Sequence, residues 1–224
     1  MRDHLGQFVL SSNLQFARGI LLLDDCEGTC TWTASATDAN ATVTFDTAAA
    51  FIGVNGLKLF SGDADPAEND YVAATKYLSP PEAGLLCFRA RLASPDISLL
   101  KTIDIILYYC DGSHLYQFSL RYTVADGSIK YYPASGTLTA IPTLATPIND
   151  LQWVNIELIA DTRDLAYISA RFNGIYASLA GIAPYDTGAD TTRRLDLRII
   201  TTIAGATEGT LYADCIYAGE FEQI

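Results

Sequence analysis

An acidic run, SGDADPAEND at positions 61–70, contains the residue types that bind calcium. Asp63, Asp65 and Asp70 stand close enough in the sequence for their carboxylates to share one ion, and calcium takes six to eight oxygen ligands. The run lacks the ligand spacing of an EF-hand loop. A calcium site and a solvated surface loop are therefore both open for this segment.

Carboxylates could also hydrolyse glycosides, which requires two carboxyl groups about 5 Å apart or about 6.5–9.5 Å apart. Asp104 and Glu157 lie in strand-like segments, each without an acidic partner on its own face. His114 lies in the turn-like segment DGSHLY, and the sequence contains neither a serine nucleophile elbow nor a phosphate-binding glycine loop. The sequence therefore predicts that the protein is not an enzyme.

Cysteines are a further source of chemistry, and the chain has five, scattered along its length: Cys26, Cys30, Cys87, Cys110 and Cys215. Their odd number argues against a full disulfide framework. A zinc site would need a closed set of four ligands, and only two histidines supplement the thiols. We expect buried free thiols, and a Cys26–Cys30 bridge stays open because it requires a sharp turn at 27–29.

Tyrosines could provide a platform for sugar rings, which stack on flat aromatic faces. The chain has thirteen tyrosines, and the candidates are Tyr116, Tyr131, Tyr132, Tyr176 and Tyr185. Tyrosine is also favoured in strands and at subunit interfaces, where the ring is buried while the hydroxyl reaches water. Carbohydrate binding and subunit contact are both open on this ground.

The segments that carry these residues alternate apolar and polar side chains with the period of a β-strand. In QFSLRYTV, Phe118, Leu120 and Tyr122 fall on one face. The stretch WVNIELIADTRDLAYISARFNGI, 153–175, predicts two strands joined by a polar turn and followed by an Asn-Gly turn. About ten or eleven such strands, with turn signals between them, predict an all-β antiparallel jelly-roll sandwich.

The domain organisation follows from where the alternation begins. Residues 1–18 are polar and do not alternate cleanly, so we expect an N-terminal arm there and a single jelly-roll domain over 19–224. The arm is expected to contact a neighbouring subunit, and the alternative is a disordered tail.

Charge and hydropathy exclude several classes of partner. The net charge is -12, the pI is about 4.4, and no lysine or arginine cluster offsets this, which argues against nucleic-acid binding and against anionic membranes. The sequence contains no run of about 18 apolar residues, so it does not predict a membrane-spanning segment. The start of the chain lacks the pattern of a secretion signal. Only 18% of residues are charged and the mean hydropathy is +0.18, which indicates either apolar surface covered by other copies or a large sandwich core that uses these residues.

Several segments resemble the concanavalin A-like superfamily, which includes laminin-G-like and carbohydrate-binding jelly rolls. They are LLLDDCEGTCTW near the first strand, NGLKLFSG, LYYCDGSHLYQFSLRY, the 153–175 hairpin, and GTLYADCIYAGEF in the last strand. The resemblance extends from about Leu21 to Phe221 and is one of pattern and order. It therefore implies the fold more strongly than the function.

In many carbohydrate-binding members of this superfamily, acidic residues of the first and last strands share a structural calcium ion. The resemblance implies Asp25 or Glu27, together with Asp214, as the ligands here. The CEGTC segment departs from the family, which has a longer loop at this position. A structural calcium ion is thus the one possible cofactor.

The expected function is that of a non-catalytic structural or assembly protein, namely a virion component such as a capsid decoration, turret or tail protein. Thr/Ala-rich segments such as ATDANATVTFDTAAAF are typical of contact loops, and we expect homo-oligomers that contact other particle subunits at the virion surface. The alternative is a carbohydrate-binding module that stacks sugars on exposed tyrosines. It would reach the cell surface or the extracellular space without a classical signal peptide.

Overall fold

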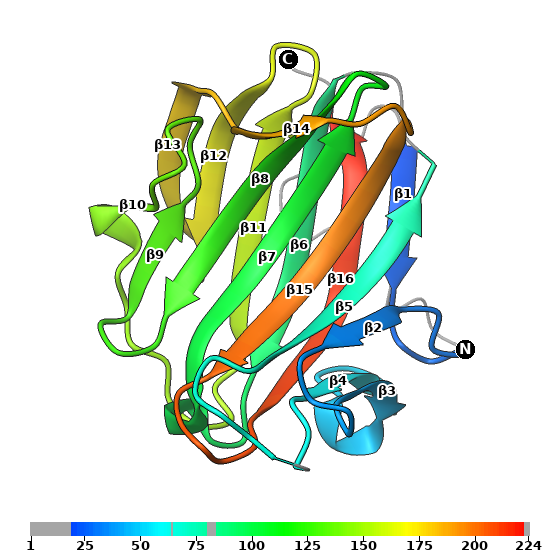
Figure 1. Cartoon of the computed structure of the whole chain (residues 1–224), viewed down its shortest axis with the longest axis vertical. Coiled ribbons are helices and arrows are strands. Elements are labelled where there is room, and N and C mark those ends of the chain that lie inside the picture. Colours follow the sequence, from blue (N-terminus) through cyan, green and yellow to red (C-terminus); the bar gives the residue numbers. More distant parts are fainter. Residues whose placement is uncertain (1–18, 64, 80–83, 222–224) are drawn as a thin grey trace.

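The computed structural model describes residues 19–63, 65–79 and 84–221 of the chain, and over these it is a sandwich of two antiparallel β-sheets (Figure 1). The expected arm at 1–18 lies outside the described residues. We call the sheet that faces the viewer in Figure 1 the front sheet and the other the back sheet. The described part confirms the predicted all-β sandwich.

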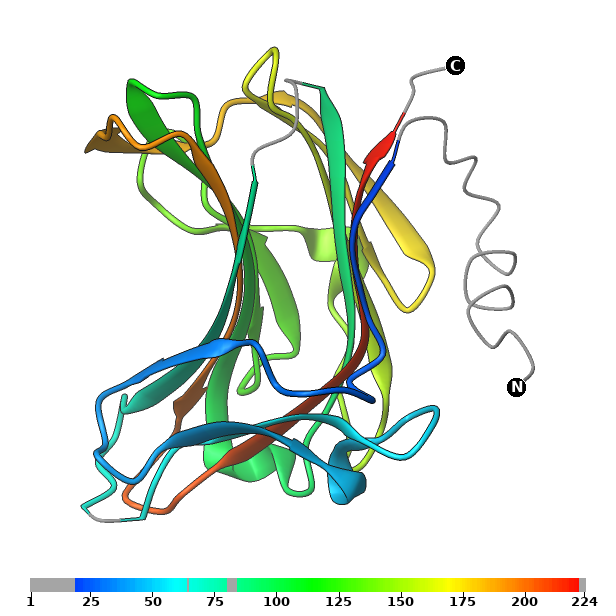
Figure 2. The ribbon, with the colours of Figure 1, turned by 90° about the vertical axis from the view of Figure 1, so that its right-hand side faces the viewer.

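The front sheet has eight strands. In spatial order they are β10 (Thr139–Ala140), β9 (Ser128–Tyr131), β8 (His114–Thr123), β7 (Leu100–Cys110), β15 (Arg194–Ile203), β5 (Tyr71–Leu78) and β2 (Thr33–Ala36), with β14 (Tyr185–Ala189) also paired to β8. Figure 2 shows that this sheet curves, so that its outward face is concave. Long central strands thus form the floor of a trough.

The back sheet also has eight strands. Their order is β13 (Ile175–Ile182), β12 (Ala166–Phe172), β11 (Val154–Asp161), β6 (Leu85–Ala93), β16 (Thr210–Phe221), β4 (Gly56–Phe60) and β3 (Thr42–Asp46), with β1 (Gly19–Asp24) paired to β16. Three short 3-10 turns complete the described elements: η1 (Thr47–Ala49), η2 (Ile97–Leu99) and η3 (Pro142–Leu144). Within the described residues no helix is long and apolar enough to cross a membrane.

The hairpin predicted at 153–175 is confirmed. β11 and β12 pair antiparallel, and Val154, Ile156 and Leu158 are buried in the core between the sheets. Asn173 and Gly174 both have positive φ, 49° and 82°, as a two-residue type I′ turn requires. Local alternation and one turn signal therefore sufficed to predict this part of the fold.

The described residues form sixteen strands, more than the ten or eleven predicted. The additional strands are mostly short edge strands with exposed side chains, such as the two residues of β10 and the four of β2. A strand with no buried face shows no apolar alternation, and its pairing comes from backbone hydrogen bonds alone. Counting by alternation consequently misses it.

The core contains aromatic pairs that cross between the sheets. Phe118 of β8 meets Tyr167 of β12 edge to face, with ring centroids 5.2 Å apart, and Tyr122 stacks on Phe172 at 5.8 Å. The hydroxyls of both tyrosines have partners: that of Tyr122 accepts from the Ile148 amide at 3.0 Å, and that of Tyr167 donates to the Tyr132 carbonyl at 3.0 Å. Each pair of this kind contributes about 0.5–1.5 kcal/mol to stability beyond the contribution of the apolar area that it buries.

All five cysteines are free thiols, and four of them are buried, as expected: Cys26, Cys87, Cys110 and Cys215. Cys30 is half-buried and is not bridged to Cys26. Burial raises the pKa of the Cys215 thiol to about 12. These thiols act as small apolar side chains of the core.

Candidate functional site

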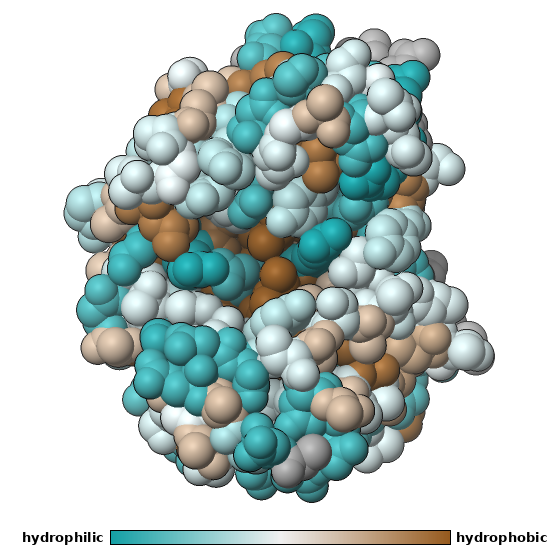
Figure 3. All heavy atoms as spheres, in the orientation of Figure 1, coloured by the Kyte–Doolittle hydropathy of each residue, from teal (hydrophilic) through white to brown (hydrophobic). Residues whose placement is uncertain are grey.

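The outward face of the front sheet contains a trough, which Figure 3 shows as a depression with hydrophobic atoms at its floor and hydrophilic atoms at its sides. It consists of two adjoining hollows of about 410 Å³ and about 540 Å³ that share Asp104, Ile106 and Arg121. We call them together the groove. Its floor comes from β2, β5, β15, β7 and β8, and residues 132–138 form one wall. Its volume is in the range of ligand sites.

Strand alternation places the floor residues. In β7, Ile103, Ile105 and Leu107 point into the core, so Asp104 and Ile106 point outward. The register sets their neighbours across the sheet: Asp104 lies between Arg121 and Ile200, and Ile106 between Ser119 and Arg198. Residues from distant parts of the chain thus form one continuous floor.

Asp104 and Arg121 form an ion pair on this floor. The Arg121 Nε atom donates to Asp104 Oδ1 at 2.7 Å, and the Thr102 hydroxyl donates to Oδ2 at 3.4 Å. Asp104 is only 4% exposed, and its burial raises the pKa of the carboxyl, while the guanidinium of Arg121 opposes that shift. The pair offers a ligand both hydrogen-bond donors and acceptors.

Arg198 lies beside this pair, with its guanidinium carbon 4.6 Å from the centroid of the Tyr108 ring. Its Nε atom is buried without a hydrogen-bond partner, and no carboxylate of the described residues forms an ion pair with it. Burial raises the pKa of the Tyr108 hydroxyl, and the charge of Arg198 opposes the shift. A phenol that stays neutral and a stacked cation therefore share this part of the floor.

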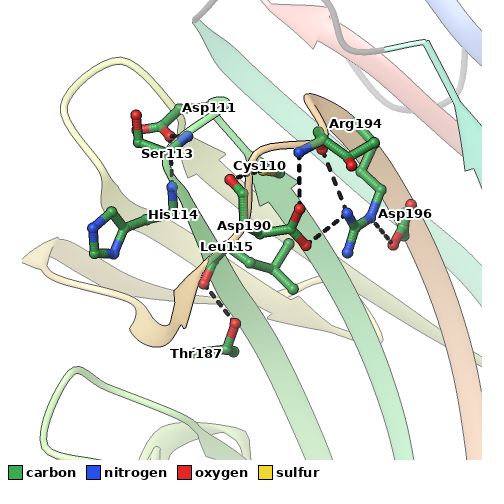
Figure 4. A network of polar contacts seen from close by, with 10 residues as sticks. Cys110, Asp111, Ser113, His114, Leu115, Thr187, Asp190, Arg194 and Asp196 are labelled. Carbon is green, nitrogen blue, oxygen red and sulfur yellow. Dashed lines mark hydrogen bonds and ion pairs between the residues drawn. The ribbon is translucent and has the colours of Figure 1, made fainter.

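A polar network supports the floor where β14 leads into β15 (Figure 4). Arg194 bridges two carboxylates: its Nη1 atom lies 2.7 Å from Asp190 Oδ2, and its Nε atom donates to Asp196 Oδ2 at 3.0 Å. The Cys110 thiol donates to the Asp190 carbonyl at 3.2 Å. These contacts fix Asp196, which lies opposite Tyr108 in the register.

The wall of the groove contains an aromatic pair. The rings of Tyr132 and Tyr185 lie 4.6 Å apart at a tilt of 52°, and the Tyr132 carbonyl accepts from the Tyr167 hydroxyl at 3.0 Å. Gly136 has φ 73°, and a Cβ atom there would come within 3.2 Å of the Tyr185 ring. Glycine thus allows the 132–138 segment to close over the two rings.

The structure separates the five tyrosines proposed from sequence. Tyr132 lines the groove, and Tyr185 packs against it. Tyr131 packs against the core and Tyr167, while Tyr116 stacks on His114. Tyr176 is 53% exposed on β13 of the back sheet, with Arg171 over its ring.

Sequence reasoning did not select Arg198 as a site residue, and it considered Asp104 only as a catalytic acid. Alternation in KTIDIILYYC and RLDLRIIT would have placed both on outward faces. No local signal joins them, because β7 and β15 become neighbours only through the sheet order.

Two residues of the expected calcium site bind backbone amides instead of facing an open site. Asp214 Oδ2 accepts from the Phe51 and Ile52 amides at 2.8 and 2.9 Å, and its Oδ1 accepts from the Cys215 amide at 2.6 Å. Glu27 Oε1 accepts from the Val54 and Asn55 amides at 2.5 and 3.1 Å. We call residues 51–55 the anchored loop.

The other expected calcium ligands each have a different hydrogen-bond partner. Asp25 is exposed and accepts from the Glu27 amide, while Asp63 accepts from the Asn40 side chain and Asp70 caps the Ala67 amide. The amide of Asp65 donates to the Asp38 carboxylate at 3.3 Å. No three such side chains gather in the described part of the chain, and calcium binding stays a prediction.

The two carboxylates considered for catalysis are both held by arginines. Glu157 is 2% exposed and accepts from Arg89, with the Nε atom of Arg171 3.4 Å from its other oxygen. Asp104 pairs with Arg121 on the other sheet. That the protein is not an enzyme stays a prediction.

No family model and no curated protein matches the chain. Solved structures do resemble it. A carbohydrate esterase from the Shiga toxin-encoding bacteriophage phi24B superposes with a TM-score of 0.52 at 15% identity, over 85% of this chain and 90% of that one. A sialidase gives 0.51 at 11% identity, over 84% of this chain.

A carbohydrate-binding module from the β-sandwich superfamily, described as having promiscuous specificity, gives a TM-score of 0.50 at 16% identity over 93% of this chain. This chain spans 17% of the sialidase chain and 64% of the module's chain. At such low identity these likenesses show the fold alone. The shared fold is a jelly-roll β-sandwich, the fold class that the sequence resemblance implied.

Proposed function

We propose that the protein is a non-catalytic carbohydrate-binding module whose ligand lies in the groove. The observation that carries this proposal is the combination of an aromatic wall at Tyr132 with the Asp104–Arg121 pair on the floor. A saccharide presents apolar C–H faces and rows of hydroxyls at once. Aromatic rings pack against the former, and paired charges donate to and accept from the latter.

The shape of the groove also supports a saccharide. The trough crosses five strands and has an open side, so a chain of sugar units could extend along it. Small side chains such as Ala73 and Ser119 leave room above the floor. Among the structures with similar folds is a carbohydrate-binding module, which is consistent with this use of the fold.

Glycan-array screening followed by isothermal titration calorimetry tests the proposal. We expect saturable binding, which Tyr132→Ala weakens about tenfold because the ring contact contributes about 1–1.5 kcal/mol. The matched control is Tyr176→Ala, which removes an exposed tyrosine far from the groove on the back sheet. Equal losses in both variants, or no binding to any glycan, would contradict the proposal.

A second candidate is the structural subunit expected from sequence, and the anchored loop favours it. Phe51, Ile52 and Val54 are exposed there, Val54 by 63%, although carboxylates hold the backbone of this loop. The Phe51 ring also meets Trp153 at 5.3 Å. Apolar side chains held in one conformation are suited to contact another protein.

The structural reading has its own test. Light scattering of the wild-type protein should give a mass above 24.2 kDa if copies associate, and Val54→Asp should reduce it to the monomer. The phage origin of one similar structure is consistent with a particle component. We also propose that the protein associates with other particle subunits at the virion surface. A monomeric mass for both wild type and Val54→Asp would argue against this.

A further inference from the structure

We propose that the groove selects saccharides that carry a carboxylate, such as uronic or sialic acid units, and that Arg198 binds that carboxylate. This inference rests on the proposed carbohydrate function and specifies its ligand class.

The first argument is the charge on the outward face of the front sheet. Two of its arginines are already paired: Arg121 with Asp104 at 2.7 Å, and Arg194 with both Asp196 at 3.0 Å and Asp190 at 2.7 Å. Arg198 is the third arginine and has no ion pair with any described residue. Arg198 is therefore the guanidinium of this face that has no carboxylate in ion-pair contact among the described residues.

The second argument is the orientation of Arg198. Its guanidinium lies over the Tyr108 ring at 4.6 Å, which occupies one flat side of the group. Stacking of this kind leaves the N–H groups at the edge of the plane available, and a carboxylate can accept two of them in parallel. The Nε atom of Arg198 is buried without a hydrogen-bond partner, so the donors open to a ligand are those of the terminal Nη atoms.

The third argument concerns the neighbours of Arg198 within the groove. In the register Arg198 lies between Thr75 of β5 and Ile106 of β7, and both of these also line the first hollow. Neither side chain can neutralise a positive charge. A ligand that covered Arg198 without a negative group would remove the guanidinium from water with no carboxylate in ion-pair contact, which is unfavourable.

The fourth argument is that the whole chain carries a net charge of -12. An acidic polymer is therefore not attracted to this protein in general, and long-range repulsion is screened beyond about 8 Å at physiological ionic strength. Binding of an acidic saccharide requires a local cation at contact distance. Arg198 supplies one on the floor of the groove.

The alternative is that Arg198 only supports the floor by stacking on Tyr108. A supporting role predicts that replacement lowers the melting temperature and changes affinity for all glycans equally. A binding role predicts a change in the preference between charged and uncharged forms of the same glycan. The ratio of two affinities separates the roles even where a variant is less stable.

The experiment compares each acidic ligand with its methyl ester, which keeps the sugar and removes the charge. The probes are tri-galacturonate, tri-mannuronate and 3′-sialyllactose with their esters, measured by titration calorimetry against wild type, Arg198→Gln and Arg198→Lys. We expect wild type to bind at least one acid about tenfold or more tightly than its ester. Arg198→Gln should abolish this preference, and Arg198→Lys should keep part of it.

The matched control is Arg171→Gln, because Arg171 also lies over a tyrosine ring, that of Tyr176 at 5.7 Å, but on the back sheet. This control should leave the preference unchanged. Equal binding of acids and esters by wild type would overturn the inference while leaving carbohydrate binding in the groove intact. A preference that survives Arg198→Gln would overturn the role of Arg198, and binding of no probe, charged or neutral, would contradict both proposals.

Discussion

The groove and the anchored loop both depend on buried carboxylates, yet the two regions use them differently. Asp104 in the groove is 4% exposed and holds a guanidinium, whereas Asp214 beside the loop is 0% exposed and holds backbone amides. Burial raises the pKa of both carboxyls, and the hydrogen-bond donors oppose the shift in each case. The partner therefore decides what a buried carboxylate does.

The consequence is a difference in what each region presents to solvent. In the loop, Asp214 and Glu27 accept hydrogen bonds from main-chain amides, so the side chains of Phe51, Ile52 and Val54 are free to face outward. In the groove, the carboxylates hold side chains, and polar and aromatic groups face the hollow. The loop is thus suited to apolar contact and the groove to a hydrophilic ligand.

The largest expected effect concerns the loop. Asp214→Ala leaves three amides without their acceptor, and we expect a loss of about 3 kcal/mol in the free energy of unfolding, measured by urea denaturation. Asp25→Ala is the control, because Asp25 is exposed and accepts one amide at 3.3 Å; it should lose no more than about 0.5 kcal/mol. Similar losses for both would show that the loop is not held by Asp214.

Next in size is a pH-dependent effect in the groove. Arg121→Ala leaves the Asp104 carboxylate buried without its cation, and we expect the free energy of unfolding to fall by about 2 kcal/mol at pH 7. The folded-state pKa of Asp104 already lies above its ordinary value of 3.8, so the folded state binds this proton more tightly than the unfolded chain. The stability loss caused by Arg121→Ala is therefore largest above the folded-state pKa of Asp104, where the carboxyl is charged, and it declines as the pH falls toward 3.8.

Denaturation of Arg121→Ala and wild type between pH 4 and pH 7 would measure this trend. Arg163→Ala is the matched control, since Arg163 also pairs with a buried carboxylate, that of Asp161 at 3.3 Å. Asp161 keeps the amides of Arg163 and Asp164 as donors, so we expect a smaller loss. A larger loss in the control would break the distinction between carboxylates held by amides and by guanidinium groups.

A smaller effect is expected for Glu27→Ala. Its carboxylate accepts hydrogen bonds from two amides of the anchored loop. Because these amides are exposed, water can replace the carboxylate as their acceptor, and we expect a loss of about 1 kcal/mol in the free energy of unfolding. Limited proteolysis should show faster cleavage within 51–55, and glycan binding in the groove should not change. A change in glycan affinity would mean that the two regions are coupled.

The smallest expected effect is that of calcium. Glu27 and Asp214 already accept amide hydrogens, and a cation at the same oxygens would have to displace them. We expect 5 mM calcium, compared with excess chelator, to shift the melting temperature by less than about 1 °C. A clear rise that Asp214→Ala removes would establish the calcium site that the resemblance implied.

The sequence by itself determined the longer alternating strands and their faces. In 153–175 the alternation of Val154, Ile156 and Leu158, and the Asn173–Gly174 turn, are local properties that act within a few residues. These features need no knowledge of which strands become neighbours.

Only the tertiary structure decided the groove and the partners of the acidic residues. Arg198 lies beside Asp104 because β15 inserts between β5 and β7, a pairing of segments almost a hundred residues apart. Asp214 meets amides 163 and 162 positions earlier in the chain, which no local pattern encodes. Alternation tells which face a side chain occupies, but its neighbours across the sheet depend on strand order and register, and these are set by the packing of the whole core.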